Sequence, residues 1–123
     1  MTKKRKVKYA YSLSPMQSGL LFQALYAPDS DAYFIQNILG LEGKVDSVTL
    51  KSAWQLVSDS FDVLKTGFIW QDGKKPFQYV LDSIPLPFIE YDWGNTEKEI
   101  QSSKLKEFIQ KDRKKGFNLS RAP

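Results

Sequence analysis

Cysteine and histidine are both absent from the 123 residues. Without cysteine there is no disulfide framework, thiolate nucleophile or cysteine-based metal site, which is compatible with a reducing cytoplasm. Without histidine the chain lacks the usual general base near neutral pH, the histidine-dependent nucleophile pairs and the commonest metal ligand. Carboxylates, lysines and tyrosines are present but show no recognised catalytic spacing. We therefore expect no catalytic residue and no metal site in this chain.

Long hydrophobic runs are also missing. No apolar stretch approaches the roughly 20 residues needed to span a bilayer, and the basic segment Met1–Lys8 is not followed by the apolar core of a signal peptide. We expect no membrane association and a cytoplasmic location. With 41% hydrophobic, 26% charged and 14% aromatic residues, the composition is that of an ordinary globular domain, and the length suits one core.

Positive charge is concentrated near the N-terminus, although the formal net charge is only +4. Such a cluster could bind nucleic acid or an acidic partner by electrostatic attraction. The chain shows no aromatic and basic platform of the kind that single-strand binders use, so nucleic-acid binding is a minor hypothesis. We expect a solvated, disordered tail over residues 1–10, which contains Lys3, Lys4, Arg5, Lys6 and Lys8.

Helix-start signals and an apolar stripe coincide in the stretch Leu13–Tyr26. Ser14 can cap a helix, Pro15 suits the first helical position, and Gln17 completes a Ser-x-x-Gln capping box. Gly19 costs about 1 kcal/mol against alanine inside a helix, so we expect it to mark a close packing contact. The helix would carry a wide apolar face made of Met16, Leu20, Leu21, Ala24 and Leu25.

The spacing of apolar residues predicts further helices, where it follows the helical period, and further strands, where it follows a two-residue period. The apolar residues of the second helix, Trp54 among them, indicate core packing rather than ligand recognition. Together the helices and strands predict a single α+β domain. The expected elements are a strand over Tyr33–Leu41 with both faces covered, a helix capped by Asp46 that runs to about Asp59, a strand over Val63–Trp70, a hairpin turn at Asp72-Gly73 and a partner strand over Phe77–Leu81.

The last third of the chain contains two prolines and a strongly basic helix. Pro85 and Pro87 would interrupt an interior ladder, so Ile84–Tyr91 is expected to be a loop followed by a short edge strand. Asn95 or Thr96 should cap the last helix, with a second capping box in Thr96-x-x-Glu99. Gly116 is the expected stop, and the lysines of this helix are expected to form a solvated face.

Three stretches carry motif-like sequences in a fixed order. Residues 14–22 read Ser-Pro-Met-Gln-Ser-Gly-Leu-Leu-Phe, residues 62–68 read Asp-Val-Leu-Lys-Thr-Gly-Phe, and residues 113–123 read Arg-Lys-Lys-Gly-Phe-Asn-Leu-Ser-Arg-Ala-Pro. The first two resemble the opening core motifs of a nonribosomal peptide synthetase condensation domain, the second of which is Arg-His-Glu-x-Leu-Arg-Thr-x-Phe. The third is similar to the stretch that leads into the next strand of the N-terminal lobe. The resemblance covers about residues 11–123, so we expect these to form part of that lobe.

The resemblance implies a chloramphenicol-acetyltransferase-like fold, an α/β sandwich of two related lobes around a cleft. It also implies a reaction in which the amine of an aminoacyl acceptor attacks the thioester of a peptidyl or acyl donor. Both substrates would be held on phosphopantetheine arms of carrier proteins, and no cofactor would be bound by this chain directly. The expected setting is secondary-metabolite and antibiotic biosynthesis.

The chain differs from the family pattern at the residues that carry out or support the reaction. The active-site signature His-His-x-x-x-Asp-Gly is absent, and in the second motif Ser60 stands for Arg, Phe61 for His and Lys65 for Arg. Lysine keeps the charge of arginine but loses its planar fork. The residues that match the motifs are expected to support the active site rather than to catalyse. They are Ser14, Met16, Gln17, Gly19, Asp62, Leu64, Lys65, Thr66 and Phe68.

Two functions therefore remain open. The chain is expected to be an N-terminal piece of a condensation domain from a truncated or split synthetase gene, inactive when alone. The alternative is a binding module that docks a carrier protein or complements a separately encoded remainder. Half a lobe would leave strands unpaired, so self-association through an exposed sheet edge is a further expectation.

Overall fold

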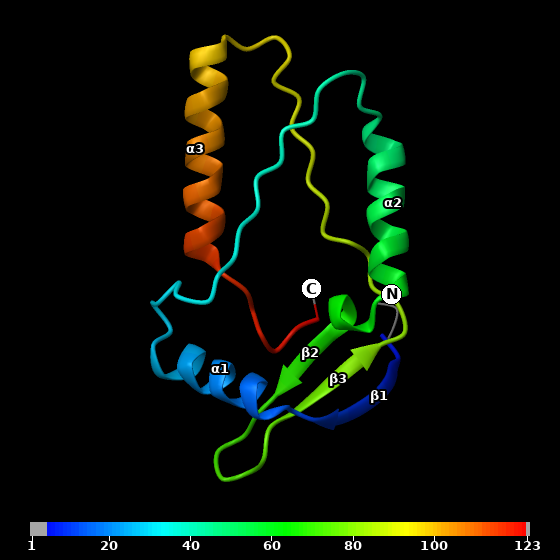
Figure 1. Cartoon of the computed structure of the whole chain (residues 1–123), viewed down its shortest axis with the longest axis vertical. Helices are drawn as coiled ribbons and strands as arrows, with labels where there is room; N and C mark the ends of the chain where they lie inside the picture. Colours follow the sequence, from blue (N-terminus) through cyan, green and yellow to red (C-terminus); the bar gives the residue numbers. More distant parts are fainter. Residues whose placement is uncertain (1–4, 123) are drawn as a thin grey trace.

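The computed structural model describes residues 5–122, so residues 1–4 of the basic tail predicted over 1–10 lie outside that range. Helices and a small sheet both occur, which confirms the α+β class. Figure 1 shows α1 and the sheet at one end of the molecule, with α2 and α3 extending toward the other. The elements are β1 (Val7–Ser12), α1 (Pro15–Tyr26), α2 (Ser47–Ser60), the 3-10 turn η1 (Asp62–Lys65), β2 (Thr66–Ile69), β3 (Phe77–Leu81) and α3 (Lys98–Lys115).

The sheet has three antiparallel strands in the order β1-β3-β2. Strand β1 was not predicted, and the expectation of disorder is wrong for residues 7–10, which pair with β3. The basic residues obscured the alternation of Tyr9 and Tyr11, which share one face, while the ladder shifts register between Val7 and Tyr9. All of β1 is exposed, as is usual for an edge strand that carries a charged residue, here Lys8.

Helix α1 begins as the sequence predicts. The Ser14 hydroxyl accepts from the Gln17 N–H at 3.1 Å, and Oε1 of Gln17 accepts from the Ser14 N–H at 2.9 Å, with Pro15 in the first turn. The expected apolar face is only partly used, because Leu21 is buried whereas Met16 is 77% exposed. The close contact predicted at Gly19 is wrong, since no atom lies within 4 Å of the position that a Cβ would take there.

Two segments that were expected to contain strands are extended but unpaired. Residues 33–41 form no strand, and neither do residues 84–91. Figure 1 shows the first running from α1 to α2 and the second running between β3 and α3. Ile35 is 79% exposed and Leu39 78% exposed, so the prediction that both faces of 33–41 are covered is wrong. An alternating sequence forms a strand only when a neighbouring strand pairs with it, and no described strand forms a ladder with these segments.

The second motif begins in a turn and not in a strand. Val63, Leu64 and Lys65 belong to η1, so the strand predicted from Val63 to Trp70 is reduced to β2. The partner strand β3 has the predicted bounds, and the Asp72-Gly73 turn lies between them with Gly73 at φ +75°.

Helices α2 and α3 confirm some capping predictions and correct others. The Asp46 side chain caps α2 by accepting from the Val48 N–H at 3.1 Å. Trp54, expected in the core, is 47% exposed. Helix α3 has Glu97 at its N-cap, and no side chain caps it, so the box predicted for Thr96 does not form. The Thr96 N–H is instead bonded to the Trp93 carbonyl. Gly116, at φ +60°, ends α3 as predicted.

The buried core is small and centred on β3. Val80 and Ile84 are almost completely buried, and Leu81, Ile84 and Ala122 form one apolar cluster with Tyr79 packed against it. Within residues 5–122, the helices are all too short or too polar to cross a bilayer.

Candidate functional site

The first motif reaches the sheet through one side chain, that of Gln17. Its amide and the amide of Gln78 in β3 bond reciprocally, with N···O distances of 3.1 Å and 2.9 Å. Gln78 is 3% exposed and also donates to the Ser12 carbonyl at 3.2 Å. Oε1 of Gln17 therefore accepts from both Gln78 and the Ser14 N–H. This pairing satisfies a buried amide and sets the position of α1 on the sheet.

Sequence reasoning did not identify Gln78. The sequence contains only a weak signal, because the alternation of Phe77, Tyr79 and Leu81 places Gln78 on the opposite face of the strand. The burial of Gln78, which makes its amide need a partner, is seen only in the structure. Among the other first-motif residues, Ser14 caps α1, Met16 is 77% exposed, and Gly19 has no atom within 4 Å of the position that a Cβ would take.

Lys65 is the centre of the second motif. Its side chain is 4% exposed, and Nζ donates to the backbone carbonyls of Asp59 at 2.7 Å and Asp82 at 3.4 Å. Nζ also lies 3.4 Å from Oδ1 of Asp62. Three acceptors match the three donors of an ammonium group. Asp59 is in the last turn of α2, where a cation also favours the negative end of the helix. Lys65 therefore joins α2, η1 and the end of β3.

Asp62 connects that lysine to β1. Tyr9 donates its phenolic hydroxyl to Oδ2 of Asp62, and Lys8 lies 3.5 Å from Oδ1. The Tyr9 hydrogen bond, with smaller effects from Lys65 and Lys8, lowers the pKa of Asp62 below its usual value. The same hydrogen bond and the Asp62 charge raise the pKa of Tyr9. We call Lys8, Tyr9, Asp62 and Lys65 the Asp62 cluster.

The remaining second-motif residues lie along β2. Thr66 is buried and donates its hydroxyl to the Asp62 carbonyl at 2.7 Å, which fixes the turn before the strand. Phe68 lies opposite Gln78 in the ladder, and its N–H donates to the Leu119 carbonyl at 3.0 Å. Leu64 is 38% exposed. Gln78 is thus bonded to the first motif at Gln17 and paired with the second at Phe68.

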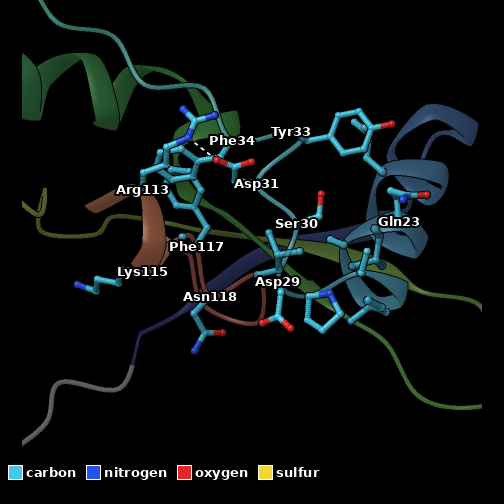
Figure 2. Close-up of a pocket in the computed structure, with 18 of the residues that line it drawn as sticks. Gln23, Asp29, Ser30, Asp31, Tyr33, Phe34, Arg113, Lys115, Phe117 and Asn118 are labelled. Atoms are coloured by element: carbon cyan, nitrogen blue, oxygen red, sulfur yellow. Dashed lines mark hydrogen bonds and ion pairs between the residues drawn. The ribbon is translucent and has the colours of Figure 1, made fainter. Parts of the chain in front are cut away.

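A cavity of about 1010 Å³ lies beneath α1, and we call it the α1 cavity. Figure 2 shows its Asp31 and Arg113 side, where the two residues form an ion pair. Arg113 also lies over the Phe34 ring, 5.8 Å from its centroid, and Phe34 contacts Phe117 with ring centroids 5.1 Å apart. Most of the other walls are apolar, and they include Leu20, Leu21, Ala24, Leu25, Phe68, Trp70 and Leu119.

The hydrogen bonds and ion pairs of these groups connect separate elements of the fold. The Asp62 cluster is held by mutual hydrogen bonds, and it lies apart from the α1 cavity, none of whose lining residues it contains. Among residues 5–122 no three His, Cys, Asp or Glu side chains are grouped so that they could hold a metal ion. The geometry fits a scaffold whose polar contacts set the relative positions of α1, α2 and the sheet.

The Asp62 cluster predicts a pH dependence of stability. Because folding lowers the pKa of Asp62 from 3.8, its contribution is present above that value and is lost as pH falls through the folded pKa. Because folding raises the pKa of Tyr9 from 10.0, its contribution is present below 10.0 and is lost as pH rises through the folded value. Urea midpoints measured across pH should fall less steeply toward acid in Asp62→Asn than in the parent.

The matched control for that measurement is Asp72→Asn, in the exposed turn between β2 and β3. It should leave the acid limb of the parent unchanged. An Asp62→Asn variant whose midpoint falls with acid as steeply as that of the parent would contradict the assignment.

Comparisons with known proteins agree with the motifs. The family model described as the condensation domain matches residues 7–123. A linear gramicidin synthase of Brevibacillus parabrevis is 41% identical over 113 residues, which cover 92% of this chain and 1% of that protein. Gramicidin S synthase 2 of Aneurinibacillus migulanus is 33% identical over 98% of this chain and 3% of its own length. Surfactin synthase subunit 3 of Bacillus subtilis (strain 168) is 32% identical over 96% of this chain and 9% of its own length.

The chain thus spans between 1% and 9% of the length of these curated relatives. The match nevertheless covers both motifs, the α1 cavity and β1, whose first residue is also the first residue matched. The chain belongs to the condensation domain family.

Proposed function

We propose that this chain supplies the N-terminal part of a condensation domain in a peptide-antibiotic synthetase, as a scaffold within a chloramphenicol-acetyltransferase-like lobe. The observation that carries this proposal is the bonding of Gln17 to Gln78, opposite Phe68 in the ladder. It joins the two motif regions through the buried side chain of Gln78. The motif-matching residues, from Ser14 to Phe68, act in this proposal as structural support.

The proposed reaction of the complete domain is amide formation between two carrier-bound substrates. The acceptor amine attacks the thioester carbonyl of the donor, so that a C–N bond forms, the C–S bond breaks, and the donor thiol leaves with the proton that the amine loses. Phosphopantetheine arms on the carrier proteins hold both substrates, and the setting is the cytoplasm. The chain has no histidine, so the imidazole chemistry of His-His-x-x-x-Asp-Gly has to come from a remainder of the domain.

The test is an amide-formation assay with two loaded carrier proteins. The purified chain alone should give no amide product by mass spectrometry. Addition of a polypeptide that carries the histidine signature and the rest of a condensation domain should give product, while that polypeptide alone should give none. Amide formed by the chain alone would overturn the proposal, and so would a remainder whose activity does not depend on the chain.

A second function, a partner-binding module, is favoured by the charge of α3. Its lysines largely face solvent. Its C-terminal end is tied to the segment between α1 and α2 by the ion pair of Arg113 with Asp31 and by Asp112, which accepts from Gln36 at 2.9 Å. An acidic carrier protein would complement such a face. Salt-sensitive copurification with a carrier protein, lost when Lys106 and Lys114 are both replaced by glutamate, would support this function. Retention of carrier protein by that charge-reversed chain would exclude it.

A further inference from the structure

The loop between β2 and β3 contains an aspartate followed directly by a glycine, Asp72-Gly73. Residues 70–76 belong to no strand, and residues 71–75 are all exposed. Figure 1 shows this loop extending beyond the end of the sheet. Among the described residues, the one backbone hydrogen bond within the loop runs from the Lys74 N–H to the Gln71 carbonyl at 3.1 Å. A loop held by a single exposed hydrogen bond opens at little cost in free energy.

An aspartate that precedes a glycine can form an intramolecular imide. The backbone nitrogen of Gly73 attacks the Cγ atom of the protonated Asp72 carboxyl group, so that a C–N bond forms, a C–O bond breaks, and water leaves with the proton of the nitrogen. A water molecule then opens the ring. Opening at Cγ restores aspartate. Opening at the former carbonyl carbon of Asp72 breaks the original peptide bond, and the resulting isoaspartate has the same mass and an additional main-chain carbon.

The structure leaves both reacting groups accessible. Within residues 5–122 the Gly73 N–H makes no backbone hydrogen bond, and the Asp72 carboxylate takes part in no ion pair. No atom lies within 4 Å of the position that a Cβ would take on Gly73. Glycine also adopts the widest range of backbone conformations. The loop can therefore rearrange into the bent form that ring closure needs.

Two other aspartates provide comparisons within the same chain. Asp59 and Asp82 each precede a serine, which is also small. Asp59 lies in α2, where the helix fixes the nitrogen of Ser60. The Asp82 N–H donates to the Lys6 carbonyl at 3.1 Å, and the Asp82 carbonyl accepts from Nζ of Lys65 at 3.4 Å. Both backbones are held in place, so we expect little ring closure at either position.

We propose that Asp72 is a modification site at which the chain converts spontaneously to isoaspartate, through an imide formed with the Gly73 nitrogen. The proposal is independent of the proposed function, because the conversion needs no partner, cofactor or second chain. The additional main-chain carbon enters next to Ile69 and Phe77, the ladder pair closest to the loop. The hairpin is loosened there. Because β3 carries Gln78, the contact between α1 and the sheet is weakened as well.

Storage of the purified chain in mildly acidic buffer tests the site. Samples taken over time are digested with trypsin, which releases residues 66–74 as one peptide. The isoaspartyl form of this peptide separates by chromatography at the same mass, and an endoprotease that cleaves before aspartate cuts only the unmodified form. The isoaspartyl form should accumulate at Asp72. Accumulation at Asp59 and Asp82 should be at least about tenfold slower, which corresponds to a barrier higher by about 1.4 kcal/mol.

A matched pair of variants tests the two reacting groups. Asp72→Glu keeps the charge but lengthens the side chain, so ring closure should be lost. Gly73→Asn adds a side chain to the residue that supplies the nitrogen, and asparagine tolerates the positive φ of +75° at this position. Its conversion should be at least about tenfold slower than in the parent. Circular dichroism checks that both variants keep their helices. Equal conversion in Gly73→Asn and the parent would overturn the proposal, as would conversion in Asp72→Glu.

The pH dependence of the rate identifies the leaving group. The Asp72 carboxyl oxygen leaves as water only from the protonated group, so conversion of the parent should slow as the pH rises. Asp72→Asn loses ammonia instead and reacts through the deprotonated Gly73 nitrogen, so its conversion should become faster as the pH rises. Absence of conversion in the parent at every pH, or conversion of Asp59 or Asp82 as fast as that of Asp72, would overturn the proposal.

The effect on the hairpin is measured on the converted protein itself. The isoaspartyl and unmodified forms of the whole chain are separated, and urea unfolding of each is followed by circular dichroism. The isoaspartyl form should have the lower urea midpoint. Equal midpoints would contradict the proposed loosening of the hairpin.

Discussion

Replacement of Lys65 by methionine is expected to lower the free energy of unfolding by about 3 kcal/mol. The change removes a buried ammonium group from the carbonyls of Asp59 and Asp82 and from the Asp62 carboxylate. Loss of one partner in a buried charged network commonly costs 3–5 kcal/mol, since the remaining groups stay buried without their partner. We take the lower end because Asp62 is 34% exposed and can be hydrated. Urea unfolding followed by circular dichroism measures the effect.

Two further variants make that experiment specific. Lys65→Arg keeps the charge and the donors, so it should lose much less stability than Lys65→Met. Lys111→Met removes an exposed lysine that pairs with Glu107 along α3, and exposed pairs of this kind contribute little. If the arginine and methionine variants were equally destabilised, the charge and hydrogen bonds of Lys65 would not be what holds α2 to β3.

Replacement of Gln78 by leucine is expected to cost about 2 kcal/mol. It leaves the Gln17 amide and the Ser12 carbonyl without their partner in β3. A buried group left unsatisfied costs about 1–3 kcal/mol, and because Gln17 is half-buried and Ser12 exposed, we expect the two together to cost a value within that range. Leucine recovers part of this by apolar burial. The double variant Gln17→Leu with Gln78→Leu should be less destabilised than the sum of the two single variants, because both partners of the pair are then gone.

The control for Gln78 is Gln71→Leu, at an exposed position next to the turn between β2 and β3. It should change the urea midpoint very little. Strictly additive losses in the Gln17 and Gln78 variants would show that the reciprocal amide pair does not couple α1 to the sheet.

The parts of the fold that depend on neighbouring residues could be predicted from the sequence. Ser14 and Gln17 cap α1, Asp46 caps α2 and Gly116 ends α3, each through contacts within a few residues. The Asp72-Gly73 turn and the bounds of β3 follow the same logic. Capping and turn residues bond to groups a few residues away in the chain, so the rest of the fold rarely changes the structures that they predict.

Strands and side-chain pairs that depend on residues far away in the sequence could not be predicted in the same way. The alternating residues 33–41 satisfy a strand pattern, yet they pair with nothing in the described range. Strand β1 forms because β3 is there to pair with it. The candidate site was found through its motif residues, but Gln78, which bonds to one motif and pairs with the other, lies in neither. Strand pairing and side-chain pairing across the sheet depend on the whole fold.

Gly67 in β2 limits which residues can occupy its position. A methyl group added at Gly67 would collide with the outer atoms of the Tyr79 ring, and that ring can move aside only by releasing the Ser120 carbonyl. Position 67 therefore accepts a larger side chain only together with a smaller one at position 79. Such a pair of changes would remove the Tyr79 hydroxyl that binds the Ser120 carbonyl, and would loosen the C-terminal segment from β3, about fifty residues further along the chain.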